Sequence, residues 1–197
     1  MRRHVNDPYV RRAHAQGYRS RAAYKLLEID ARDRLLKAGA VVVDLGAAPG
    51  GWSQVAMEKV GVKGKVVSVD LLEMQPVPGA RFIQGSFLDP AVRGAVLEAA
   101  GGRADAVLSD MMPNVSGIAS SDQARAAELT HAAIDFCAEI LRPDGAFLVK
   151  VFQGSEFGAI LAALRRKFGS VQTRKPRASR GESRETYLLG RSLKGIQ

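Results

Sequence analysis

Short runs of β-branched and apolar residues alternate along this chain with segments of helical periodicity, and this alternation limits the possible folds most strongly. The predicted strands are residues 41–46, 65–70, 81–85, 104–110 and 145–152. The predicted helices lie at residues 20–36, 52–60, 89–100, 122–141 and 155–168. Strands that alternate with helices are typical of a mostly parallel sheet covered by helices on both faces. The sequence therefore predicts an α/β fold.

The chain closes with two predicted strands, near residues 170–175 and 185–190, which are joined by a basic loop without a helix. Such a pair is expected to form an antiparallel hairpin at one edge of the sheet. Ligands of open α/β sheets bind outside the carboxyl ends of the strands. The candidate site residues are therefore those that end the predicted strands or lie close to their ends: Asp44, Asp70, Ser86, Asp110 and Lys150.

The length of 197 residues fits a single domain over residues 1–197, with a basic N-terminal arm over 1–19 and a core over 20–197. The single cysteine, Cys137, excludes an internal disulfide, and the three histidines have no ligand spacing, so no metal site is expected. The sequence contains no apolar run of membrane-spanning length and begins with no secretory signal. We therefore expect a cytoplasmic monomer.

Positive charge is concentrated at the two ends of the chain. Residues 1–25 contain 7 basic and 1 acidic side chains, and residues 165–197 contain 10 basic and 2 acidic ones. The middle of the chain is mildly acidic, although the whole sequence carries a formal net charge of +9. This distribution is expected for a polyanion-binding surface on an ordinary core, although two solvated tails would have the same composition.

A glycine-rich segment, DLGAAPGGW, joins the first predicted strand to its helix between Asp44 and Trp52. Glycines let backbone N–H groups approach a ligand closely at a helix N-terminus. The spacing differs from the dinucleotide fingerprint, which disfavours a nicotinamide oxidoreductase, and the segment has no P-loop lysine. Asp44 and Asp70 would make the pocket acidic, which suits a positively charged nucleoside, S-adenosylmethionine. The loop residues expected at this cofactor are Gly46, Pro49, Gly50, Gly51 and Trp52, with a core position as an equal alternative for Trp52.

Four charged residues require a joint interpretation. Lys150 lies inside the apolar run FLVKVF, where a lysine is costly to bury unless it is paired or used. Asp110 ends the preceding predicted strand and is placed to be its partner. Glu185 begins the last predicted strand, and Lys25 belongs to the first predicted helix. Each of the four alone could be a surface charge or part of a structural ion pair.

Together with other segments, these residues resemble the FtsJ/RrmJ-type ribose 2′-O-methyltransferases. The similar segments extend over nearly the whole chain: HVNDPYV, GYRSRAAYKLLEID, VVDLGAAPGGWSQ, VDLL, LSDMMPN, LVKVFQG and SRETYLL. The resemblance implies a Rossmann-like class I S-adenosylmethionine-dependent methyltransferase fold. It also implies methylation of a uridine 2′-OH of large-subunit ribosomal RNA within the assembled subunit.

The resemblance assigns roles to particular positions. It implies a tetrad of Lys25, Asp110, Lys150 and Glu185, in which Lys150 is the catalytic lysine. It also implies cofactor contacts for Gly50, Trp52, Asp70 and Asp110. With RNA as the implied substrate, the basic ends supply the candidate RNA-binding residues Arg11, Arg12, Arg19, Arg21, Arg174, Lys175 and Arg177.

One position departs from the family pattern. Relatives carry an aspartate after QG in the third strand, where it holds the adenine amino group, whereas this chain has Ser86. A serine hydroxyl can still accept a hydrogen bond, but it is neutral and shorter than aspartate. Asp89, three residues further on, is the acidic side chain that could assist.

Two other functions remain open for the same fold. One is methylation of a base amino group, although DMMPN has a single proline and no aromatic residue where such enzymes carry both. The other is a catalytically silent RNA-binding or ribosome-assembly factor. Methylation of a 2′-OH mainly requires alignment and the handling of one proton. Lys150 could act there as a base or as a stabiliser of the alkoxide.

Overall fold

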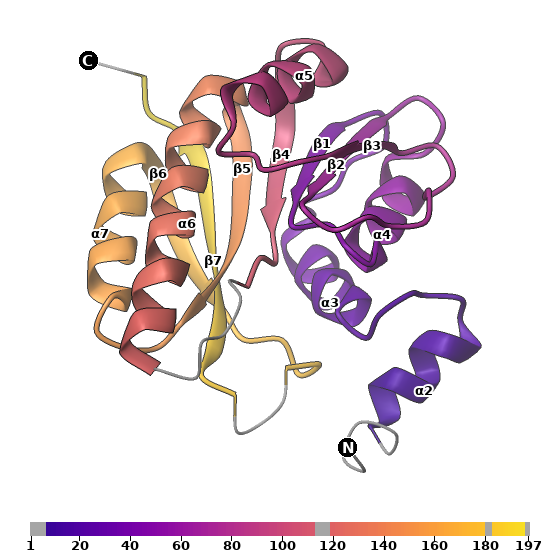
Figure 1. Cartoon of the computed structure of the whole chain (residues 1–197), viewed down its shortest axis with the longest axis horizontal. Coiled ribbons are helices and arrows are strands. Elements are labelled where there is room, and N and C mark those ends of the chain that lie inside the picture. The colour runs from indigo at the N-terminus through magenta and orange to yellow at the C-terminus, as the bar shows by residue number, and fades with distance from the viewer. Residues whose placement is uncertain (1–6, 113–118, 180–182, 196–197) are drawn as a thin grey trace.

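A seven-stranded sheet forms the centre of the computed structural model, which describes residues 7–112, 119–179 and 183–195 (Figure 1). The strands are β1 (Val41–Leu45), β2 (Lys65–Asp70), β3 (Arg81–Gln84), β4 (Ala104–Ser109), β5 (Leu141–Phe152), β6 (Phe168–Arg174) and β7 (Glu185–Leu193). Their order across the sheet is β3-β2-β1-β4-β5-β7-β6. Neighbouring strands are parallel from β3 through β2, β1 and β4 to β5, whereas β7 is antiparallel to both β5 and β6. The predicted mostly parallel sheet with an antiparallel C-terminal hairpin is confirmed.

Helices cover both faces of this sheet, as expected for a Rossmann-like fold (Figure 1). They are α2 (Pro8–Ala15), α3 (Ala23–Asp33), α4 (Gly51–Val60), α5 (Pro90–Ala100), α6 (Ala119–Ile140) and α7 (Phe157–Lys167). Helices α3 and α4 pack on one face of the sheet, and α5, α6 and α7 pack on the other. Among the helices described, none is long and apolar enough to cross a bilayer.

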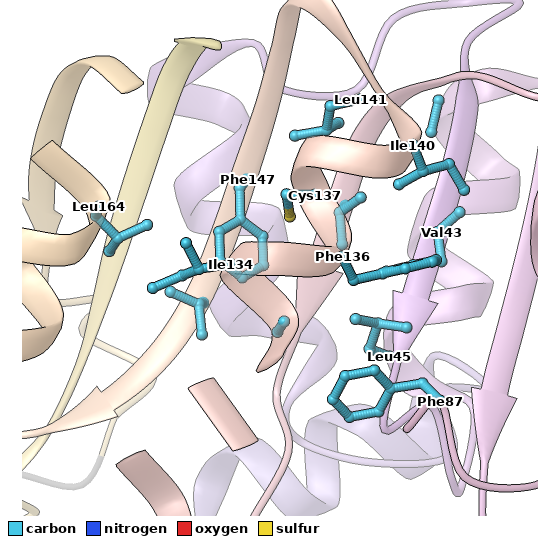
Figure 2. Close-up of a cluster of buried hydrophobic side chains, with 14 of the residues drawn as sticks. Val43, Leu45, Phe87, Ile134, Phe136, Cys137, Ile140, Leu141, Phe147 and Leu164 are labelled. Atoms are coloured by element: carbon cyan, nitrogen blue, oxygen red, sulfur yellow. The ribbon is translucent and has the colours of Figure 1, made fainter. Parts of the chain in front are cut away.

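Successive residues of the central strands point to opposite faces and divide the core into two layers. Val42 of β1 belongs to the layer formed with α3 and α4, whereas its neighbour Val43 belongs to the layer formed with α5, α6 and α7. Figure 2 shows the second layer, where Phe136 lies beside Val43 and Cys137 lies beside Phe147. Cys137 is fully buried, and this burial raises the pKa of its thiol. Its role is therefore core packing.

The N-terminal arm contains a helix, α2, that the sequence analysis did not predict. The Asp7 side chain caps this helix by accepting a hydrogen bond from the Tyr9 N–H at 3.0 Å, and Pro8 occupies its first turn. The same capping aspartate followed by proline predicted the start of α5 correctly, where Asp89 precedes Pro90. The division of one domain into an arm over 1–19 and a core over 20–197 stays a prediction.

The position of β7 decides what can meet at the carboxyl edge of the sheet. Because β7 runs antiparallel to β5, its first residue lies beside the last residues of β5. The register pairs Glu185 with Phe152 and Tyr187 with Lys150. The sequence predicted the hairpin of β6 and β7, but it did not predict that β7 lies between β5 and β6.

Candidate active site

The loop after β1 requires glycine at two positions. Gly46 and Gly50 have φ values of +76° and +106°, where other residues are strained. A Cβ at Gly46 would lie 2.3 Å from Cγ of Met111, so the loop passes very close to the segment after β4. Gly50 is the N-cap residue of α4, and the first N–H groups of a helix lack acceptors within it. The loop therefore presents N–H donors at the carboxyl edge of the sheet.

A cavity of about 420 Å³ opens beside this loop. It lies over the carboxyl ends of the parallel strands, where open α/β sheets bind their ligands, and its volume is typical of small-molecule sites. Four expected site residues line it, namely Gly46, Asp70, Ser86 and Asp110. Three exposed apolar side chains also line this cavity, namely Leu71, Leu72 and Met112.

Asp70 is held in a fixed orientation at the end of β2. Its Oδ2 accepts a hydrogen bond from the Ala48 N–H at 2.9 Å, and its Oδ1 accepts one from the Leu72 N–H at 2.8 Å. Since each carboxylate oxygen can accept more than one hydrogen bond, Asp70 can still bind both hydroxyls of a ribose. The Ser86 hydroxyl accepts a hydrogen bond from the Leu88 N–H at 3.2 Å and can donate its own proton.

Asp44 is a fully buried carboxylate with one unpaired oxygen. Its Oδ2 accepts a hydrogen bond from the Ser53 hydroxyl at 2.7 Å, whereas Oδ1 has no partner among the described residues. Burial raises the pKa of Asp44 to about 7, the nearby charges of Asp110 and Asp70 add to the rise, and the Ser53 hydrogen bond opposes it. Asp44 itself does not line the cavity, but it lies two residues before Gly46, which does, and its unpaired oxygen is an acceptor that would suit a cationic group.

Three residues expected near the cofactor have other partners. The Trp52 side chain is 3% exposed and its Nε1 donates to the Ala22 carbonyl at 2.8 Å, so the core alternative holds for this side chain. A Cβ at Gly51 would lie 2.4 Å from Oγ of Ser20, so this glycine lets α4 pack against the segment before α3. Asp89 caps α5.

The four residues of the expected tetrad come together at the carboxyl edge of the sheet. Lys150 Nζ lies 3.1 Å from Oδ1 of Asp110 and donates to the Asp110 carbonyl at 2.8 Å. Lys25 Nζ lies 2.6 Å from Oε1 of Glu185. Lys25, Lys150 and Glu185 are 9%, 8% and 8% exposed. The tetrad therefore consists of two nearly buried ion pairs, one from α3 and β7 and one from the ends of β4 and β5.

Tyr187 links the two ion pairs, and the sequence analysis did not identify it. Its hydroxyl donates to Oδ1 of Asp110 at 2.8 Å and lies 3.4 Å from Oε1 of Glu185. Its ring packs against Trp52, with 5.7 Å between the ring centroids. The signal was present in the sequence, because a residue two positions after Glu185 in a strand lies on the same face.

The charges in this cluster shift the acidity of its members in opposite directions. Burial alone would raise the pKa of Glu185, but the hydrogen bond and charge of Lys25, with help from Lys150 and Ser179, lower it overall. Burial and the two carboxylates of Asp110 and Glu185 raise the pKa of Tyr187 well above its ordinary value. Glu185 is therefore ionised at neutral pH, and the Tyr187 hydroxyl keeps its proton.

The expected RNA-binding residues divide into two groups. Arg11 and Arg12 are exposed on α2, and Arg177 is exposed on the loop between β6 and β7. Lys175 is also exposed on that loop, although its Nζ donates to the Ser183 carbonyl at 2.6 Å. All four residues are exposed, and their role in RNA binding stays a prediction.

The other three are held by the protein itself. Arg174 is 9% exposed and forms two hydrogen bonds with Asp33, at 2.6 and 2.7 Å. The half-buried Asp33 carboxylate takes up its guanidinium, and its expected role in RNA binding stays a prediction. Arg21 pairs with Asp7 and donates to the Ala178 carbonyl. Arg19 donates to the Pro49 carbonyl in the glycine loop and to the Pro76 carbonyl in the segment between β2 and β3.

Within the residues that the structure describes, no three His, Cys, Asp or Glu side chains are grouped as metal ligands. The carboxylates of this edge are instead hydrogen-bonded to backbone N–H groups, hydroxyls and lysines. The arrangement provides a cavity with fixed acceptors for a nucleoside and a neighbouring lysine that can handle a proton.

Comparison with known proteins agrees with this geometry. The FtsJ-like methyltransferase family matches residues 18–193. The chain is 57% identical over 196 residues to ribosomal RNA large subunit methyltransferase E of Azoarcus sp. (strain BH72), covering 98% of this chain and 95% of that protein. It is 52% identical over 191 residues to the protein of the same name from Methylobacillus flagellatus, covering 96% and 92%.

Solved structures are also similar. A crystal structure from Plasmodium falciparum, described as a ribosomal RNA methyltransferase, superimposes with a TM-score of 0.81 at 32% identity and covers 91% of this chain and all of that one. Fibrillarin of Aeropyrum pernix, solved with bound S-adenosyl-L-methionine, shares the fold with a TM-score of 0.60 at 15% identity, covering 88% and 75%. The chain is therefore an S-adenosylmethionine-dependent enzyme that belongs to the FtsJ-like methyltransferase family.

Proposed function

We propose that this enzyme transfers a methyl group from S-adenosylmethionine to the ribose 2′-OH of a uridine in large-subunit ribosomal RNA. The observation that carries the proposal is the nearly buried Lys150 amine, held 3.1 Å from Asp110 at the edge of the cofactor cavity. A buried lysine at this edge fits the handling of a hydroxyl proton. The names of the relatives at 57% and 52% identity support the choice of RNA.

The cofactor residues follow from the polar groups around the cavity. Asp70 would bind the ribose hydroxyls, and Asp44 and the N–H groups of the glycine loop would hold the amino-acid part. Ser86 would contact the adenine by one neutral hydrogen bond, because Asp89 is engaged as the cap of α5. When bound, S-adenosylmethionine supplies an electrophilic methyl group on a sulfonium.

Lys150 would act on the 2′-OH of the RNA as its proton is lost. A neutral amine would accept this proton, whereas a charged one would stabilise the developing alkoxide. Asp110 orients the amine through its carboxylate and its carbonyl, which fixes Nζ at one place. Lys25, Glu185 and Tyr187 surround this pair with matched charges and hydrogen bonds, so that the cluster stays ordered when a hydroxyl approaches.

RNA would reach the site over α2 and the loop between β6 and β7, which carry the exposed Arg11, Arg12, Lys175 and Arg177. The family resemblance supports the assembled large subunit as the substrate. A ribosomal substrate also agrees with the expected cytoplasmic location, and the monomeric state stays a prediction.

The test is a map of ribosomal RNA 2′-O-methylation in cells with and without this protein. We expect one uridine of the large subunit to lose its 2′-O-methyl group and to regain it when the gene is restored. Loss of a base methyl group instead would favour amino methylation. An unchanged map together with altered subunit assembly would favour a catalytically silent factor.

A further inference from the structure

Arg19 connects two segments that border the cofactor cavity. Its guanidinium donates to the carbonyls of Pro49 at 3.3 Å, Pro76 at 2.7 Å and Gln75. Pro49 belongs to the glycine loop after β1, and residues 75 and 76 belong to the segment between β2 and β3. The interactions of this side chain are therefore with backbone carbonyls of the enzyme, although it belongs to the basic arm.

Both segments form walls of the cavity. Gly46 and Ala48 line it from the glycine loop, and Asp70, Leu71 and Leu72 line it from the start of the other segment. A guanidinium is planar and has several N–H donors, so that it can bridge carbonyl acceptors on two separate loop segments. The Arg19 side chain thus ties the two walls to each other.

The glycine loop passes very close to the Arg19 side chain at Gly50. A Cβ at Gly50 would lie 2.9 Å from Nη1 and 3.3 Å from Cδ of Arg19, and 3.0 Å from Cγ2 of Val77. The backbone of Arg19 is fixed as well, because its N–H donates to Oε1 of Gln54 in α4 at 2.9 Å. The amide nitrogen of Gln54 in turn donates to the Gly17 carbonyl at 2.9 Å.

We propose that Arg19 is a positioning residue for the cofactor, which fixes the spacing between the glycine loop and the segment after β2. The inference rests on the proposed cofactor site, and it replaces the sequence-based expectation that Arg19 contacts RNA. An RNA contact requires only positive charge at this position, whereas the bridge requires the forked guanidinium. Lysine at position 19 could therefore preserve an RNA contact, but it could not preserve the bridge.

The test compares Arg19→Lys and Arg19→Gln with Arg11→Gln, a matched control on the exposed face of α2. Calorimetric titration with S-adenosylmethionine in the absence of RNA measures cofactor affinity, and filter binding measures affinity for ribosomal RNA. Thermal melting on the same samples checks the fold. Initial rates at saturating RNA, with cofactor varied, give the KM for S-adenosylmethionine and kcat separately.

Both Arg19 variants should weaken cofactor binding by about tenfold, as expected when a charge-assisted hydrogen-bonded bridge is lost. Arg19→Lys should raise the KM for the cofactor, keep kcat near that of the unmodified enzyme and retain RNA affinity. Arg11→Gln should weaken RNA binding and leave cofactor affinity unchanged.

Unchanged cofactor affinity in Arg19→Lys, with RNA binding lost only in Arg19→Gln, would overturn the inference and restore the RNA contact. An unmodified protein that binds no S-adenosylmethionine would instead overturn the proposed function, and the inference with it. The two failures are distinguishable because the titration requires neither RNA nor turnover.

Discussion

At the scale of single residues, Asp44 is a carboxylate whose ionised form is disfavoured by its buried position. It is fully buried, one of its oxygens is unpaired, and burial raises its pKa to about 7. In the unfolded chain an aspartate has a pKa of about 3.9. Between these two values the folded protein binds more protons than the unfolded chain, so this group makes stability fall as pH rises through that window.

Asp44→Asn should remove this pH dependence, because asparagine keeps the shape and a hydrogen-bond acceptor for Ser53 but does not ionise. As pH rises from 4.5 to 8, the free energy of unfolding of the variant should increase relative to that of the unmodified protein. Urea denaturation of both cofactor-free proteins at several pH values measures this difference. A difference between the two proteins that stays constant over this range would show that Asp44 is ionised throughout. The variant should also bind S-adenosylmethionine more weakly at pH 8.

Two arginines of the C-terminal region look alike in the sequence and differ in the fold. Arg174 is buried against Asp33 and holds the pKa of that carboxyl below its usual range, whereas Arg177 is exposed. Arg174→Ala would leave Asp33 with its main partner removed and should cost about 3 kcal/mol of stability. Arg177→Ala should change stability by less than about 0.5 kcal/mol.

Denaturant titration of the two variants, with filter binding to ribosomal RNA on the same preparations, checks this contrast. Arg177→Ala should weaken RNA binding at a melting temperature near that of the unmodified protein. Equal loss of stability in both variants would mean that the Arg174–Asp33 pair contributes nothing particular to the fold.

At the scale of elements, the sequence predicted strands and helices well where periodicity and capping residues agreed. The segments 65–70 and 81–85 became β2 and β3 with at most one residue of difference. The first predicted helix was too long at both ends, since α3 begins at Ala23 and stops at Asp33, where Arg34 adopts φ +49°. Leu35 and Leu36 are buried without being helical, so apolar periodicity alone overstated the helix.

The candidate site was predictable where its residues end parallel strands, as Asp44, Asp70 and Asp110 do. The same argument could not place Glu185, because its position depends on β7 running antiparallel between β5 and β6. Only the family resemblance joined Glu185 to Lys25. Nor could charge alone distinguish Arg19 and Arg174 from exposed arginines. Arg19 donates to backbone carbonyls and Arg174 to the Asp33 carboxylate, and these partners are distant in sequence.

Helix α2 and the loop between β6 and β7 should bind RNA by electrostatic attraction. We expect the triple substitution of Arg11, Arg12 and Arg177 by alanine to flatten the log–log dependence of RNA affinity on salt. Each lost phosphate contact should reduce the slope by roughly 0.7–0.9. Cofactor affinity should stay unchanged, because these side chains do not line the cavity.

The matched control replaces Lys63 and Arg103, which are exposed before β2 and β4 and thus lie at the opposite edge of the sheet. This double variant should keep the slope of the unmodified protein. A slope that responds to the control and not to the triple variant would place the RNA on the other edge.

At the scale of the whole molecule, the fold brings the two basic ends of the chain together. The Glu28 carboxylate in α3 accepts hydrogen bonds from the N–H groups of Arg177 and Ala178, at 2.6 and 3.0 Å. Arg191 of β7 donates to the Asp33 carbonyl at 2.6 Å, and Lys25 meets Glu185. The basic surface and the tetrad thus depend on the same contacts between the N-terminal helices and the C-terminal hairpin.

Lys150→Arg separates the two roles open to this lysine. Arginine keeps a positive charge for an alkoxide but does not act as a base near neutral pH. Appreciable methyl transfer by this variant would favour charge stabilisation. If the amine is the base, the rate of the unmodified enzyme should rise with pH until Lys150 is fully deprotonated.

The most direct measurement of the central claim is transfer of a labelled methyl group from S-adenosylmethionine to large-subunit ribosomal RNA by the unmodified enzyme and by Lys150→Ala. The unmodified enzyme should label a ribose 2′-OH, and the variant should lose turnover. Calorimetry and thermal melting on the same samples should show nearly unchanged cofactor affinity and an intact fold, because Lys150 is not among the residues that line the cofactor cavity. Near-normal methyl transfer by Lys150→Ala would contradict the account.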